Sequence, residues 1–157
     1  MKIRAVLLFV LLLGLSSHVT FAFDKKDFYK VLASNALTEI ESQFDAVKTL
    51  SLPERDAYEG ALMMKKAGLQ KDKKAQLKLF KEGKGKLEGA INKEPENCEF
   101  RLLRLIIQEN APSALGYNKQ IEQDCTFIGE NYKSAPSVLK TIIRDYSKQS
   151  QKLKLPA

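Results

Sequence analysis

The chain has 157 residues, and its 26 Lys and Arg residues outnumber its 19 Asp and Glu residues, which gives a formal charge of +7. This length and composition indicate one globular domain rather than a disordered or collagen-like chain. The only histidine, His18, lies in a segment that we expect to be removed. The mature protein would then contain no imidazole, which excludes Ser-His-Asp and Cys-His catalysis, histidine-ligated zinc and the HExxH metalloprotease pattern.

Residues 1–22 predict a cleaved secretory signal peptide. Lys2 and Arg4 precede an uninterrupted apolar stretch over residues 5–15, and Thr20-Phe21-Ala22 forms a small-x-small cleavage site. The alternative is an uncleaved anchor, but this apolar stretch is much shorter than the roughly 20 residues that span a bilayer. We therefore expect an exported protein, periplasmic or secreted, in which residues 23–157 form one domain of charge +5 without a transmembrane segment.

Hydrophobic periodicity predicts an all-α domain of six to seven helices joined by short connections. Residues 24–50 carry apolar positions at helical spacing, interrupted near Ser34-Asn35. The next helix should begin at Ser51, because Ser51 and Glu54 match the S-x-x-E capping box, and it should end at Gly68.

The second half of the chain contains the most apolar predicted helix. Asp72 should cap a helix that runs to about Lys93, and Asn97 then opens the apolar helix, which we expect at the centre of the fold. Two further helices are predicted, around residues 121–132 and after Ser137. The polar tail from Lys148 onward is expected to fray.

One stretch resembles a known repeat family. Gly83, Leu87 and Ala90 follow at spacings of four and three, and Pro95 and Glu96-Asn97-Cys98-Glu99 come next. This order resembles the second helix of a tetratricopeptide repeat and the start of the next repeat. The resemblance implies antiparallel helical hairpins stacked as a short solenoid, with a helical bundle as the alternative, and a groove that binds a peptide or protein. In general plan the chain is also similar to small exported bacterial proteins.

The apolar helix carries the residues that we predict to bind a partner. Arg101 and Arg104 lie three apart and share an edge that Gln108 continues, and two guanidinium groups suit a carboxylate or phosphate. Tyr117 and Asn118, in the loop that follows, could join them. The alternative for the arginines is internal ion pairing with nearby acidic residues: Glu94, Glu96 and Glu99.

Positive charge is concentrated between residues 65 and 93, where ten lysines and three acidic residues give a net +7. Lys71, Lys74, Lys78 and Lys81, which we name the basic strip, follow one another at helical spacing. The strip is either a solvated face or a docking surface for anionic lipid or acidic envelope polymers. Nucleic acid is not an expected partner, because the protein should be exported and the strip lacks interleaved aromatic residues.

Cys98 and Cys125 are the only cysteines. In an antiparallel helix pair they would lie about one helical turn apart, roughly 5.4 Å, which is comparable with the Cα separation that a disulfide requires. A disulfide in an oxidising compartment is therefore one interpretation, and two separately buried thiols are the other.

These observations together predict an exported, non-enzymatic binding or scaffold protein that engages a peptide or protein in the cell envelope, with no cofactor and no metal site. One alternative is a basic factor that docks on an anionic membrane or envelope polymer. The weakest is a small envelope hydrolase that uses paired carboxylates, for which Glu122 and Asp124 are among the candidates.

Overall fold

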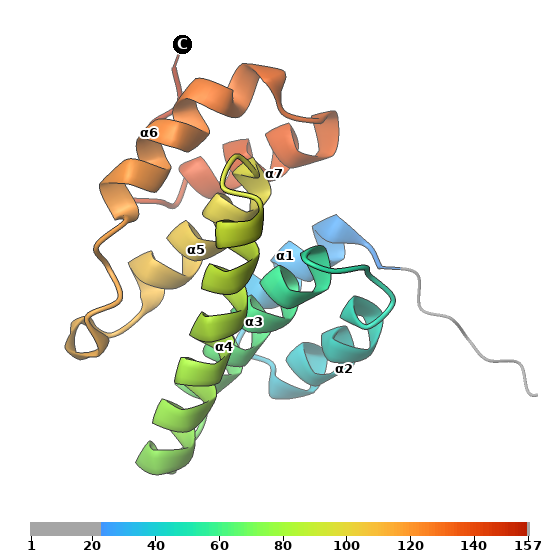
Figure 1. Cartoon of the computed structure of the whole chain (residues 1–157), viewed down its shortest axis with the longest axis vertical. Helices are drawn as coiled ribbons and strands as arrows, with labels where there is room; N and C mark the ends of the chain where they lie inside the picture. Colours follow the sequence, from blue (N-terminus) through green and yellow to red (C-terminus); the bar gives the residue numbers. More distant parts are fainter. Residues whose placement is uncertain (1–22, 157) are drawn as a thin grey trace, which may run out of the picture.

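A computed structural model describes residues 23–156, and this part of the chain consists of helices without a strand (Figure 1). The α-helices are α1 (Lys25–Ala33), α2 (Leu37–Val47), α3 (Glu54–Gly68), α4 (Lys73–Lys93), α5 (Cys98–Asn110), α6 (Ile121–Asn131) and α7 (Ser137–Ser147). Two short 3₁₀ turns, Ser113–Leu115 and Tyr132–Ser134, flank α6. The predicted all-α class is confirmed, whereas the predicted signal peptide lies outside the described residues.

Two helices begin where side-chain capping predicted that they would. The Asp72 carboxylate accepts a hydrogen bond from the Ala75 backbone N–H at 2.6 Å and starts α4. The Asn97 side chain accepts from the first-turn amides of α5. Such caps satisfy donors that the first helical turn leaves unpaired.

The predicted capping box at Ser51 is wrong. The helix α3 begins at Glu54, Pro53 occupies the capping position, and no side chain caps the helix. Ser51 stands two residues before the cap, so its hydroxyl does not serve the first turn. The Glu54 carboxylate instead lies 3.4 Å from the ammonium of Lys25 on α1.

The helices α3 and α4 form a hairpin whose axes approach closely at two glycines. A Cβ atom on Gly60 would lie 2.6 Å from the carbonyl oxygen of Gly83 and 2.7 Å from the backbone nitrogen of Leu87. The expectation that Gly83 lets a paired helix approach closely is therefore confirmed, because only hydrogen occupies the Cβ position on both sides. The end of this hairpin where α3 passes into α4 extends beyond the other helices (Figure 1).

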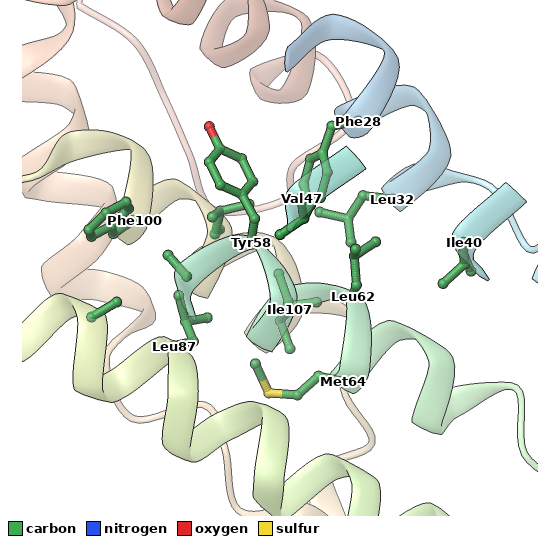
Figure 2. Packing of buried hydrophobic residues seen from close by; sticks show 14 of the residues in the cluster. Phe28, Leu32, Ile40, Val47, Tyr58, Leu62, Met64, Leu87, Phe100 and Ile107 are labelled. Atoms are coloured by element: carbon green, nitrogen blue, oxygen red, sulfur yellow. The ribbon is translucent and has the colours of Figure 1, made fainter. Parts of the chain in front are cut away.

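The core consists of two apolar clusters that share α5. The first, shown in Figure 2, joins α1–α4 and includes Phe28, Tyr58 and Leu87, with Phe100 from α5. The second joins α6, α7 and the C-terminal tail, and α5 contributes Leu102 and Leu105 to it. The predicted central position of this helix is confirmed. Between residues 23 and 156, no helix has the length and hydropathy that spanning a bilayer requires.

The predicted fraying of the tail is wrong. Leu153 is fully buried in the second cluster, and its backbone N–H donates to the hydroxyl of Ser150 at 2.8 Å. The Ser150 hydroxyl in turn donates to the carboxylate of Glu109 on α5 at 2.7 Å. One apolar side chain and one buried hydroxyl therefore hold a tail whose sequence is otherwise polar.

We predict that Gly60→Ala destabilises the protein by about 2 kcal/mol or more, because its methyl group would overlap backbone atoms that cannot rotate away. Gly85→Ala on α4 is the matched control, since nothing lies within 4 Å of a Cβ there. It should stabilise the helix by about 0.5–1 kcal/mol. Urea unfolding followed by circular dichroism measures both, and equal stability of the two variants would contradict the close helix contact.

Candidate functional site

Arg104 lies at the centre of a buried ion-pair network. Its Nε and Nη2 atoms each lie 2.7 Å from a different carboxylate oxygen of Asp124 on α6. Its Nη1 atom lies 2.9 Å from the carboxylate of Glu88 on α4. Asp124 is 0% exposed and Arg104 is 5% exposed, so both charges depend on each other rather than on water.

Arg101 joins the same network one turn earlier on α5. Its Nη1 atom lies 3.2 Å from Asp124, its Nε atom donates to the carbonyl of Pro95 at 2.8 Å, and its guanidinium stacks on Phe127. Tyr117 closes the network from the loop before α6, because its hydroxyl donates to Glu88 at 2.5 Å.

The prediction that Arg101, Arg104 and Tyr117 face a partner is therefore wrong. The alternative of internal ion pairing is confirmed, although the acidic partners are Asp124 and Glu88 rather than those at the start of the helix. The reason is that α6 packs along α5 and brings Asp124 opposite both arginines, a placement that spacing within α5 does not reveal.

Two members of the network, Arg104 and Tyr117, keep their protonation state over the usual pH range. Burial disfavours the charged guanidinium of Arg104, but hydrogen bonds and charge from Asp124 and Glu88 outweigh it and raise its pKa. Burial, together with the Glu88 carboxylate, raises the pKa of the Tyr117 hydroxyl well above its ordinary value. These groups hold α4, α5 and α6 together and are not available for proton transfer.

A cleft of about 810 Å³ lies between α1, the C-terminal end of α5, α7 and the C-terminal tail. Two of the predicted partner-binding residues, Gln108 and Asn118, line it. Gln108 is 2% exposed, and its amide nitrogen donates to the side chain of Gln120 at 2.8 Å. Its amide oxygen is buried and has no hydrogen-bond partner among residues 23–156.

Charged residues that the sequence did not single out also line this cleft. They are Lys26, Lys30, Lys65, Glu109, Asp145 and Lys152. Glu109 accepts hydrogen bonds from the hydroxyls of Tyr146 and Ser150 and from the backbone N–H of Lys152. The ammonium of Lys65 binds only a neutral oxygen, that of the Asn35 side chain at 3.1 Å, and burial lowers its pKa. These residues come from four helices and the C-terminal tail, so no local motif marks them.

The four lysines of the basic strip are all exposed: Lys74, Lys78 and Lys81 lie on the part of α4 that extends beyond the other helices, and Lys71 lies just before that helix begins (Figure 1). Lys78 lies 3.9 Å from Glu82, which is at the limit of an ion pair. Leu77, which is 43% exposed, lies among them. The predicted orientation of the strip towards solvent is confirmed.

Cys98 and Cys125 are free thiols, so the disulfide interpretation does not hold in this structure. Both pack separately against the second apolar cluster. Arg101 already lies opposite Asp124 and Phe127, so Cys98, nearly one turn earlier on α5, faces a position beyond Cys125. Burial raises the pKa of each thiol to about 11, so neither is an activated nucleophile at neutral pH.

The acidic pair Glu122 and Asp124 does not form a shared site. Asp124 is enclosed by arginines, whereas Glu122 is exposed and lies 3.4 Å from the ammonium of Lys152. Within residues 23–156, no three histidine, cysteine or acidic side chains lie together in a way that could hold a metal ion.

The chain matches no protein-family model, no curated protein and no solved structure. The resemblance to tetratricopeptide repeats therefore stays a prediction, and the function has to be argued from the cleft and the basic strip.

We predict that Arg104→Ala lowers the free energy of unfolding by about 3 kcal/mol or more, because Asp124 would keep a buried charge with a weaker partner. Arg144→Ala on the exposed face of α7 is the control and should change stability by less than about 0.5 kcal/mol. Urea unfolding measures the free energy of unfolding of both variants. If Arg104→Ala is as stable as the control, the network does not hold the helices together.

Proposed function

We propose that this protein is an exported, non-enzymatic binding protein that takes a segment of a peptide or protein partner into the cleft between α1, α5, α7 and the tail. The observation that carries this proposal is the cleft itself, about 810 Å³ in a chain of 157 residues. Ligand sites of proteins commonly have volumes of about 300–1,000 Å³ and combine apolar walls with a few polar groups.

The lining has this mixed character. Leu32, Ile106 and Ile121 supply apolar side chains from three helices, and Gln108 and Asn118 supply amides. A peptide segment presents apolar side chains together with backbone N–H and C=O groups, which suit a lining of this mixed kind. The cleft thus offers apolar and hydrogen-bonding groups to a peptide. It lies apart from Arg101 and Arg104, which do not line it.

The carboxylates of the cleft do not favour a hydrolase. A hydrolytic acid needs a raised pKa, so that it carries a proton at neutral pH. The hydrogen bond from Lys148 lowers the pKa of Asp145, and Glu109 is already bound by three donors. Asp145 is therefore a poor proton donor at neutral pH, and the oxygens of Glu109 are already engaged by donors of the protein.

The proposal is tested by filling the cleft. Ala33 is exposed and lines the cleft, so Ala33→Trp places a large side chain there without disturbing the core. Peptides selected from a displayed random library against the wild-type protein should bind Ala33→Trp at least about tenfold more weakly, a difference of about 1.4 kcal/mol.

Ala75→Trp, at an exposed alanine of α4, is the matched control and should bind the same peptides as the wild type does. Fluorescence anisotropy of the labelled peptides measures each affinity. A selection that enriches no peptide, or peptides that bind both tryptophan variants equally, would rule out the cleft as the binding site.

A second candidate function is docking on an anionic membrane through the basic strip. It is supported by four exposed lysines and the exposed Leu77 on the projecting part of α4. Each lysine near an anionic membrane contributes about 1 kcal/mol, and the attraction weakens as salt screens it.

For this candidate we predict binding to anionic but not to zwitterionic phospholipid vesicles at low ionic strength. Replacing Lys74, Lys78 and Lys81 by Glu should abolish that binding while the helical circular dichroism stays unchanged. The same charge change at Lys119, Lys140 and Lys154, which lie outside the strip, is the control and should preserve most of it. Vesicle sedimentation gives the bound fraction, and equal binding by the two triple variants would show that the strip is only a solvated face.

A further inference from the structure

The cleft carries more positive than negative charge. Its four lysines, at positions 26, 30, 65 and 152, face two carboxylates, those of Glu109 and Asp145. At neutral pH the lining therefore has an excess of two positive charges. This excess is separate from the basic strip, none of whose lysines lines the cleft.

The carboxylates of the cleft are held by neighbours other than its lysine ammonium groups. Asp145 lies 2.7 Å from the ammonium of Lys148, outside the cleft lining, and the charge of Lys26 acts on it only as the weakest of several contributions. Glu109 binds Tyr146, Ser150 and the backbone of Lys152. The ammonium of Lys152 is directed to Glu122 at 3.4 Å.

Three lysines of the cleft therefore remain without an ion pair among residues 23–156: Lys26, Lys30 and Lys65. Lys26 and Lys30 are four residues apart on α1, so they lie on one edge of that helix. Lys65 reaches the cleft from α3 and is partly buried, with only the neutral oxygen of Asn35 to bind it. A partly desolvated ammonium group without a carboxylate gains more from an incoming anion than an exposed one does.

The rest of the lining narrows the chemistry of that anion. A free phosphate or a lone carboxylate would satisfy the lysines but would leave the partly exposed side chains of Ile106 and Ile121 uncovered. An acidic peptide brings carboxylates, apolar side chains and backbone N–H groups together.

We infer that the partner segment is an acidic peptide whose carboxylates lie against Lys26, Lys30 and Lys65, while its apolar side chains cover the walls of the cleft. This inference rests on the proposed peptide-binding function and names the class of segment that the cleft selects.

The test compares three fluorescein-labelled peptides of one design, a repeated Glu-Ala-Leu-Gly sequence and its counterparts with Gln or Lys in place of Glu. The glutamate peptide should bind the wild-type protein at least about tenfold more tightly than the glutamine peptide, and the lysine peptide should not bind. Millimolar inorganic phosphate, added as a competitor, should displace little of the glutamate peptide. If millimolar phosphate displaced most of the glutamate peptide, the site would be assigned to a simple anion instead.

Two triple variants with the same change in charge locate the effect. Replacing Lys26, Lys30 and Lys65 by Gln should reduce the affinity for the glutamate peptide to that of the glutamine peptide. Replacing Lys74, Lys78 and Lys81 of the basic strip by Gln should leave the affinity within about twofold of the wild type, since the strip lies outside the cleft. Equal losses in the two variants would mean general charge attraction and would overturn the inference.

Lys65 is partly buried, so replacing it could also affect folding. The double variant Lys26→Gln/Lys30→Gln changes two exposed positions and repeats the test with Lys65 unaltered. This double variant should lose at least about threefold in affinity, and unchanged affinity would contradict the assignment.

The peptide comparison also separates the inference from the proposed function. If the glutamine peptide binds as well as the glutamate peptide and Ala33→Trp blocks both, the cleft binds peptides but does not select acidic ones. If Ala33→Trp blocks neither, both proposals fail.

Discussion

The helix α5 is enclosed by other elements, and every charged side chain that it buries must therefore find a partner on a different element. Glu99 accepts hydrogen bonds from Tyr58 of α3 and Lys25 of α1. Arg104 pairs with Asp124 of α6, and with Glu88 of α4 in addition. An unpaired charge in such a position costs several kcal/mol, so these pairs restrict how the surrounding helices can be arranged. The apolar side chains of α5 fill both clusters, whereas its polar side chains set the positions of the neighbours.

The close contact of Gly60 and Gly83 adds a second constraint, which acts on α3 and α4 alone. These two helices approach closely at the glycines and form a hairpin whose far end extends beyond the other helices (Figure 1). That far end is where the basic strip lies, exposed to solvent. The cleft lies in another part of the molecule, where α1, α5, α7 and the tail meet. The protein thus has one convex basic surface and one concave mixed surface, built from different elements.

The distribution of ion pairs explains why these two surfaces carry the excess positive charge. The arginines of α5 are neutralised inside the fold by Asp124 and Glu88, and Lys25 is neutralised by Glu54 and Glu99. Three of the four cleft lysines and most of the basic strip have no such close carboxylate partners among the described residues, whereas Lys152 of the cleft lies 3.4 Å from Glu122. A positive charge without an internal partner remains available to a ligand, and this is the physical basis of both proposed interactions.

The sequence by itself determined the helices and their local features. The starts of α4 and α5 follow from Asp72 and Asn97, and the solvent exposure of the basic strip follows from its spacing on α4, because caps and helical periodicity act within one or two turns. The central position of α5 followed in the same way from its apolar composition. Only the tertiary structure decided that Asp124 faces Arg104, that Leu153 is buried, and that Lys65 meets Lys26 at one cleft. Such contacts join residues that are far apart in the sequence: Arg104 and Asp124 are 20 positions apart, and Lys25 and Glu99 are 74 positions apart. Their formation depends on how whole helices pack and in which register, which no local pattern specifies.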